Sequence, residues 1–169
     1  MAEPGFVFDQ EVGVFLAACR TAALGTCGGD GSPHVANVQY AAAPPAPGKS
    51  SGGFGLLWVS KPEALHSEQL TANPRVAVAV YAHLDDAANI HGVQMRGTAE
   101  VISAGGEAWH AAWEAYTAKF SFVASGPQYR AAVEAQAFYR FTPQWVRWID
   151  NRRGFGWKVE KHLSTDEHR

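Results

Sequence analysis

The chain has 169 residues, a formal net charge of −2 and two cysteines that do not form a CxxC pair. This length suits one domain with a substantial hydrophobic core, and the near-neutral charge excludes a general attraction to nucleic acid or to an anionic membrane. The N-terminus has no basic and apolar signal region, and no apolar run reaches the roughly 18 residues of a membrane helix, so we expect a cytoplasmic protein.

The N-terminal part of the chain predicts a helix followed by a β-hairpin. Asp9 is a candidate N-cap for a helix that runs to about Arg20, with apolar side chains along one face. Residues 21–27 are small and typical of a strand, and residues 34–40 alternate as its partner after a dense turn signal. The Ala-, Pro-, Gly- and Ser-rich residues 41–53 then predict a long loop.

The centre of the chain predicts a strand, a helix and a second strand in succession. Residues 55–59 are apolar and suit a buried strand. Ser60 has the position of a helix N-cap, with Glu63 as its capping-box partner. Asn73 and the proline after it end the helix, and residues 75–81 form the second strand, which is apolar on both faces.

The junction between the first of these strands and the helix is a candidate anion site. Free N–H groups at a helix start, beside Ser60, Lys61 and, one turn later, His66, offer a place for a phosphate. The alternative is an ordinary capped helix whose Lys61 and His66 side chains are simply solvated. Spacing alone leaves both interpretations open.

A long alternating strand is predicted at residues 91–102, after a polar loop at residues 83–89. Its polar row includes Gln94 and either pairs within the sheet or lines a ligand groove. Gly97 lies in the apolar row, where it predicts a β-bulge or the close approach of another backbone or ligand.

The C-terminal part predicts helices and then a closing hairpin. Residues 107–122 place aromatic side chains at helical steps, a pattern typical of a core or a dimer interface, and residues 127–135 predict a short helix. Residues 138–150 and 155–159 read as paired strands, with Pro143 at an edge or a bulge, and from about residue 161 the tail is expected to be frayed.

The order of these elements predicts a closed or split antiparallel β-barrel with peripheral helices, a mainly-β or α+β fold in one domain spanning residues 1–169. The histidines show no HxH or HExxH spacing, and there is no GxSxG or GxGxxG motif. A zinc site, a nucleophile elbow and a Rossmann site are therefore not expected, and no residue is assigned a catalytic role. Any redox reactivity would have to come from a bound cofactor.

The order of these segments resembles the pyridoxamine 5'-phosphate oxidase-like, FMN-binding split-barrel superfamily. The similarity includes RTAALGT, GGDGSPHVANVQY, LLWVSKPEALHSEQLTANPRVAVAVY and GVQMRGTAEVI. The closing FYRFTPQWVRWIDNRRGFGWK is similar to an uncharacterised bacterial branch. The resemblance implies a homodimer with FMN, or another flavin or deazaflavin, at the subunit interface.

The resemblance also implies which residues bind the cofactor. Those along the ring and ribityl chain are Arg20, Thr21, Leu24, Gly25 and Thr26; those near the phosphate are Val59, Ser60, Lys61 and His66; Gln94 lies near the ring, and Arg147, Arg152 and Trp157 come from the closing hairpin. The family's Arg-Lys pair near the phosphate is replaced here by Leu65 and His66, so Lys61 is a candidate for the missing charge.

The function expected from this resemblance is that of a flavoprotein oxidoreductase whose small-molecule substrate is unknown. One alternative is a non-catalytic protein that stores or senses flavin or haem, in which case His66, His83 or His91 is the candidate axial ligand. Another is a dimeric module without a cofactor.

Overall fold

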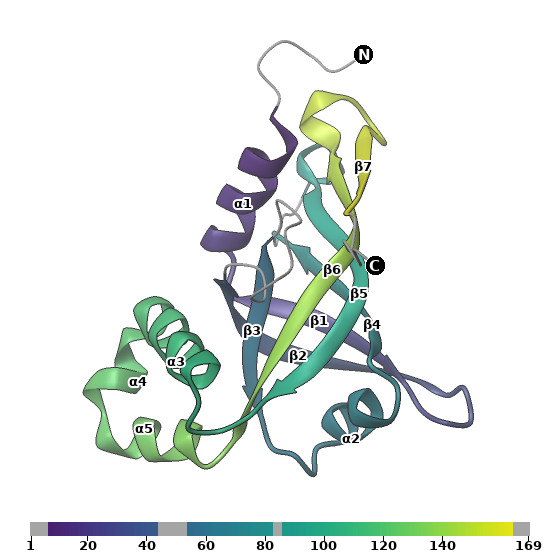
Figure 1. Ribbon diagram of the computed structural model, residues 1–169. Helices are drawn as coiled ribbons and strands as arrows, with labels where there is room; N and C mark the ends of the chain where they lie inside the picture. The colour runs from purple at the N-terminus through teal and green to yellow at the C-terminus, as the bar shows by residue number, and fades with distance from the viewer. Residues whose placement is uncertain (1–6, 44–53, 83–85, 164–169) are drawn as a thin grey trace, which may run out of the picture.

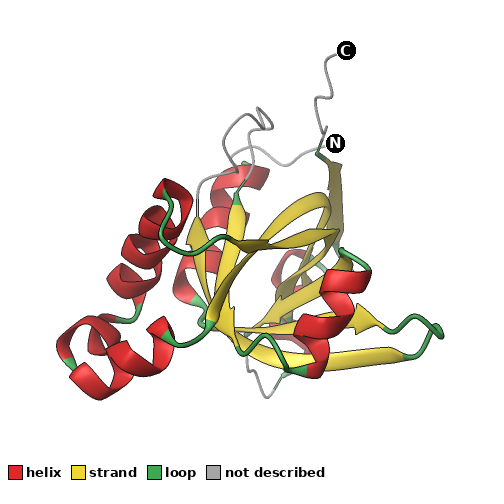
Figure 2. Ribbon diagram, turned by 60° about the horizontal axis from the view of Figure 1, so that its bottom comes forward, coloured by secondary structure: helices red, strands yellow, loops and turns green. Residues whose placement is uncertain are grey.

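Seven antiparallel strands form one sheet in the order β3-β2-β1-β4-β5-β6-β7 in the computed structural model, which describes residues 7–43, 54–82 and 86–163. A further pairing between β3 and β6 closes β1 to β6 into a barrel, which confirms the predicted fold class. Figure 2 shows these strands curving around a common axis. The strands are β1 (Thr21–Cys27), β2 (Pro33–Ala43), β3 (Gly55–Ser60), β4 (Arg75–Tyr81), β5 (His91–Ile102), β6 (Ala137–Asp150) and β7 (Lys158–His162).

In the described part of the chain, five α-helices lie around the barrel (Figure 1). They are α1 (Phe8–Ala18), α2 (Leu65–Ala72), α3 (Glu107–Lys119), α4 (Ser121–Ser125) and α5 (Pro127–Glu134), with short 3₁₀ turns η1 (Ala87–Asn89) and η2 (Asn151–Arg153). The three helices between β5 and β6 gather beside β3, whereas α2 lies near the lower end of the barrel in Figure 1. Within the described residues, no helix is both long and apolar enough to cross a membrane.

Among the described residues, two apolar clusters pack the inside of the barrel and the helices against its wall. The first fills the barrel and includes the fully buried Leu24, Trp58 and Trp148, with α1 packed against it through Leu16. The second lies between the barrel wall and helices α3 to α5. Its buried members are Ala41, Ala43, Leu57, Ile102, Ala112, Tyr116, Phe120, Val123, Val133 and Phe138. The aromatic stripe predicted at residues 107–122 therefore serves largely as core.

A bulge between β5 and β6 lies at the glycine that the sequence marks. The register shifts between Arg96 and Gly97, and Gly97 stands opposite Pro143. A Cβ on Gly97 would lie 2.1 Å from the carbonyl oxygen of Thr142, so only glycine fits there. Pro143 falls between the part of β6 that pairs with β3 and the part that pairs with β7. On the edge of β6 that faces β3 and β7, the missing N–H of Pro143 therefore costs no ladder hydrogen bond.

Two predicted helix caps are wrong. The N-cap position of α1 is Val7, so Asp9 lies inside the helix, where it is an acidic residue of the first turn. Ser60 is the last residue of β3 and pairs with Ala137 of β6, and α2 begins only at Leu65 without a side-chain cap. Ladder pairing with β6 holds Ser60 in the extended conformation and overrides its local capping signal.

The ends of several other elements differ from the prediction. β7 begins at Lys158, because the turn before it is lengthened by η2 and by two glycines with positive φ, and Phe155 is left 89% exposed. β7 runs to His162 and Leu163 is buried, so the frayed tail predicted from residue 161 is wrong for these residues. Most of the predicted loop at residues 41–53, together with His83 and residues 164–169, lies outside the described residues.

Candidate functional site

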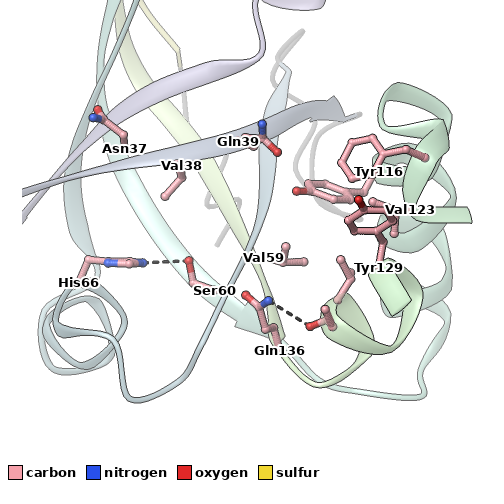
Figure 3. Close-up of a pocket in the computed structure, with 13 residues that line it drawn as sticks. Asn37, Val38, Gln39, Val59, Ser60, His66, Tyr116, Val123, Tyr129 and Gln136 are labelled. Carbon is pink, nitrogen blue, oxygen red and sulfur yellow. Dashed lines mark hydrogen bonds between the residues drawn. The ribbon is translucent and has the colours of Figure 1, made fainter. Parts of the chain in front are cut away.

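A cavity opens where β2 and β3 separate. Their ladder ends at the pair Tyr40 and Trp58, and beyond it β2 pairs with β1 while β3 pairs with β6. The space between the two strand edges, closed on the far side by α3 to α5, has a volume of about 320 Å³ (Figure 3). We call it the split cavity. Its sheet side is lined by Asn37, Gln39, Val59 and Ser60, its helix side by Tyr116, Phe122, Val123, Tyr129 and Val133, and its lower rim by His66 and Gln136.

The polar corner of the split cavity is a hydrogen bond between His66 and Ser60, with 2.9 Å between Nε2 and Oγ (Figure 3). Burial lowers the pKa of His66 below its ordinary 6.5, and the neighbouring His34, whose ring lies parallel at 6.5 Å, lowers it further. The imidazole is therefore neutral at pH 7. A phosphate at this corner would meet the Ser60 hydroxyl and the His66 imidazole, and His66 lies in the first turn of α2, although Ser60 is not the N-cap that the sequence predicts.

The outer face of the sheet carries a second recess of about 540 Å³, beside the first. Its base consists of four small residues from β1 and β4, which we call the floor. They are Ala23, Gly25, Ala77 and Ala79. The ladder register pairs Ala23 with Ala79 and Gly25 with Ala77, so the floor is flat and has no side chain larger than a methyl group.

Polar and aromatic side chains frame one side of the floor. Across β4, β5 and β6 the register places Gln94 beside Ala79 and Arg147, and Arg96 beside Ala77 and Trp145. Arg147 donates to Oε1 of Gln94 at 3.3 Å, which orients the amide. The guanidinium of Arg96 lies 4.3 Å from the centre of the Trp145 ring. The sequence leaves open whether the polar row of β5 pairs within the sheet or lines a groove. In the structure it does both.

Asn37 joins the two recesses. It lines the split cavity, and it also lines a smaller cavity of about 210 Å³ together with Thr21, Ala23 and Tyr81. Because Ala23 belongs to the floor, the recesses adjoin one another along β1 and β2.

A third recess, of about 520 Å³, adjoins the floor and shares Gly25, Ala77 and Arg96 with it. Arg75 lies on the same wall. Neither Arg75 nor Arg96 forms an ion pair within the part of the chain that the structure describes. This side of the floor is therefore electropositive and suits the anionic part of a small molecule.

The structure brings together seven of the residues that the resemblance implies. Gly25, Gln94 and Arg147 lie at the floor, Thr21 lines the smaller cavity, and Val59, Ser60 and His66 line the split cavity.

The other implied residues lie elsewhere. The Leu24 side chain is fully buried inside the barrel, and buried Thr26 donates to Gln69 at 2.6 Å, although Thr26 borders the third recess. Lys61 is exposed and lines none of these recesses. The last three implied residues line none of these recesses and make other contacts. The Arg20 guanidinium lies over Phe120, and Arg152 forms an ion pair with Asp150. The Trp157 ring lies beneath Arg153.

Several lining residues were not predicted from the sequence. Ala77 and Ala79 alternate with valines along β4, a period-two signal for an outer row of small residues that an apolar reading of both faces conceals. Asn37 belongs to the alternating strand β2 and could have been found in the same way. Tyr116, Tyr129 and Gln136 carry no such signal, because only helix packing brings them to the cavity.

The protein is a split antiparallel β-barrel with two recesses and a polar corner on its surface. The sequence profile of the family described as Pyridoxamine 5'-phosphate oxidase matches residues 8–150, so the chain belongs to this family. No curated protein matches the chain.

Solved structures share the fold. A conserved hypothetical protein from Mycobacterium tuberculosis is 24% identical, with 88% of each chain covered and a TM-score of 0.67. A heme binding protein from Mycobacterium smegmatis is 20% identical, with 96% of this chain and 60% of that chain covered and a TM-score of 0.69. A FAD-binding protein from Mesorhizobium loti is 24% identical, with 83% and 92% covered and a TM-score of 0.60. At these identities the likeness concerns the fold alone.

Proposed function

We propose that the protein binds a flavin through its FMN moiety and is an oxidoreductase acting on a small molecule. The observation that carries the proposal is the floor, a flat recess of four small residues framed by Gln94 and Arg147 and connected through Asn37 to the Ser60–His66 corner. A planar ring needs such a surface, and its phosphate needs donors at the far end of the ligand.

The residues that line the two recesses fit a flavin. The Gln94 amide, oriented by Arg147, is available to polar atoms at the ring edge, and small side chains let the ring approach the backbone of β1 and β4. A bound flavin supplies the hydride or electron transfer that the protein's own side chains do not. The protein's share is to position the ring, to exclude water from one face and to hold the phosphate at Ser60 and His66. Arg75 and Arg96 favour an anionic substrate beside the floor.

A second copy of the chain is the proposed cover for the open side of the floor. The rim carries exposed apolar side chains, with Val35 65% and Tyr81 69% accessible, and burying them would stabilise a dimer. In this arrangement the ring would lie between two subunits in a homodimer.

Absorption spectra and flavin titration test the proposal. We expect either a yellow preparation with a band at about 450 nm or full binding of added FMN by a colourless one. Bleaching of the bound flavin by reduced nicotinamide would separate an oxidoreductase from a storage protein. Sedimentation of the same sample gives the oligomeric state. Absence of flavin binding under all these conditions would refute the proposed function.

Haem binding is the second candidate, because His66 offers a neutral, half-buried imidazole at a cavity. Coordination of iron through Nε2 would require His66 to release Ser60. His91 is less suited, since it contacts the carbonyl of Asn89 at 2.8 Å and packs against Phe15 at the other end of the barrel. A Soret band on addition of haem that is lost in His66→Ala would favour this function over flavin binding.

Phosphate binding at His66 should depend on pH. We expect His66→Asn to weaken FMN binding by roughly 1–2 kcal/mol, since a hydrogen bond to a charged group is lost, and Lys61→Ala to have a smaller effect. Because a phosphate attracts the imidazolium, the advantage of the wild type over His66→Asn should grow as the pH falls from neutral through the lowered pKa.

Fluorescence titrations of wild type and His66→Asn at several pH values measure this advantage. Riboflavin, which lacks the phosphate, is the control ligand and should bind both proteins alike. Equal FMN affinities at every pH would place the phosphate elsewhere.

A further inference from the structure

We propose that the split cavity holds the adenylate half of a dinucleotide flavin, so that FAD binds this chain more tightly than FMN. The inference rests on the proposed function, because it takes the ring to lie on the floor and the first phosphate at Ser60 and His66. The inference assigns a ligand to the part of the split cavity that lies beyond the first phosphate.

The position of the cavity argues against a substrate as its occupant. Figure 3 shows the His66–Ser60 pair at one end of the split cavity and Tyr116 and Tyr129 at the other, with Val59 between them. A substrate must touch the flavin ring, and the ring lies on the floor, on the other side of the connecting residue Asn37. A ligand at the aromatic end therefore extends the cofactor from its phosphate, as the second nucleotide of a dinucleotide does.

The chemistry of the lining suits a neutral heteroaromatic base. Among the residues that the structure describes, those around the cavity include no Asp, Glu, Lys or Arg. Phe122 and Tyr129 pack edge to face with 5.2 Å between their centroids, yet they remain 44% and 48% exposed, which leaves aromatic surface for stacking.

Amide groups at the cavity provide specificity for adenine. Nε2 of Gln136 donates to the carbonyl of Ala132 at 3.0 Å, so its own carbonyl oxygen is the atom left for a ligand (Figure 3). An amide carbonyl accepts from the exocyclic amine of adenine, which is the usual pairing of Gln or Asn with this base. Gln39, on the opposite wall, offers a second amide.

The size of the cavity agrees with this occupant. Its volume of about 320 Å³ is larger than a phosphate requires. It lies at the lower end of the roughly 300–1,000 Å³ that small-molecule sites occupy, which suits one base with its ribose.

Titration of the full chain with riboflavin, FMN and FAD, followed by flavin fluorescence, tests the inference. We expect FAD to bind about 10-fold more tightly than FMN. Tyr129→Ala should weaken FAD binding about 10-fold, as expected for the loss of base stacking, and leave FMN binding unchanged. Phe155→Ala removes a more exposed aromatic side chain outside these recesses and is the matched control, with no change for either flavin.

The outcomes separate the inference from the proposed function. If FMN binds and FAD binds no more tightly, or if a folded Tyr129→Ala protein weakens both ligands equally, the inference is wrong while the proposed function stands. If no flavin binds, both fail. Gln136→Leu, which keeps the side-chain volume but removes the amide, should lower FAD affinity selectively and gives a second reading if Tyr129→Ala is poorly folded.

Discussion

Gly97→Ala is expected to destabilise the protein by more than about 3 kcal/mol, and the variant should be largely unfolded or aggregated. The added Cβ would lie 2.1 Å from the carbonyl oxygen of Thr142 and 2.9 Å from the Cα of Pro143. Both obstacles are backbone atoms of β6, which cannot rotate aside as a flexible side chain can. Relief requires β5 and β6 to separate at the bulge, and this pair is the longest ladder in the barrel.

Gly13→Ala is the matched control for this substitution. Gly13 lies in α1, and apart from its own helix backbone a Cβ there would meet no heavy atom of the described residues within 4 Å. Alanine at this helical position should stabilise the protein by about 0.5–1 kcal/mol. Urea unfolding followed by tryptophan fluorescence measures both variants. A Gly97→Ala protein with wild-type stability would show that the bulge can accommodate a side chain, contrary to the packing described.

Ala77→Leu is expected to abolish flavin binding, with at least about a 100-fold loss of FMN affinity, while the fold remains intact. Ala77 is exposed and lies on the floor opposite Gly25, so a leucine side chain would stand where the ring is proposed to lie. Its cost to folding should stay within about 0.5 kcal/mol, because the side chain can extend into solvent.

Ala118→Leu makes the same chemical change at an exposed position of α3 that lines none of the recesses, and it should bind FMN like the wild type. Equilibrium titration of both variants with FMN, with circular dichroism as a check on folding, tests whether the ring lies on the floor. Wild-type affinity in Ala77→Leu would remove the ring from the floor. Loss of affinity in both variants would point to a general effect of apolar surface and not to a ring site.

The effect of Gly97→Ala could be predicted from the sequence alone, whereas the effect of Ala77→Leu could not. Gly97 stands out in the sequence because it interrupts an alternating apolar row, and its reading as a bulge or a close approach is confirmed in both respects. The alternation of Ala77 with valines indicates an outer position, but only the pairing of β4 with β1 places Ala77 opposite Gly25.

Ser60 shows how a local signal can fail. Its capping-box pattern with Glu63 is a signal for a helix start, yet Ser60 remains in β3 because β6 pairs with it. The expectation of a polar corner at Ser60 and His66 still holds, but the corner is made by a hydrogen bond between these side chains and by open strand edges. In α2, Leu70 is the buried leucine, whereas Leu65 at the start of the helix is 52% exposed.

The sequence by itself determined the barrel class, the strands β1, β4 and β5, the end of α2 at Asn73 and the special role of Gly97. β5 follows from period-two alternation, β1 and β4 from short runs of small or apolar residues, and the barrel class from the order of the elements. The end of α2 and the role of Gly97 follow from backbone restrictions that act within a few residues. Only the tertiary structure decided that four small residues would form a floor, and that Tyr116, Tyr129 and Gln136 would face Ser60 across a cavity. Ladder register and helix packing join segments distant in sequence, and no local pattern encodes which side chains they will bring together.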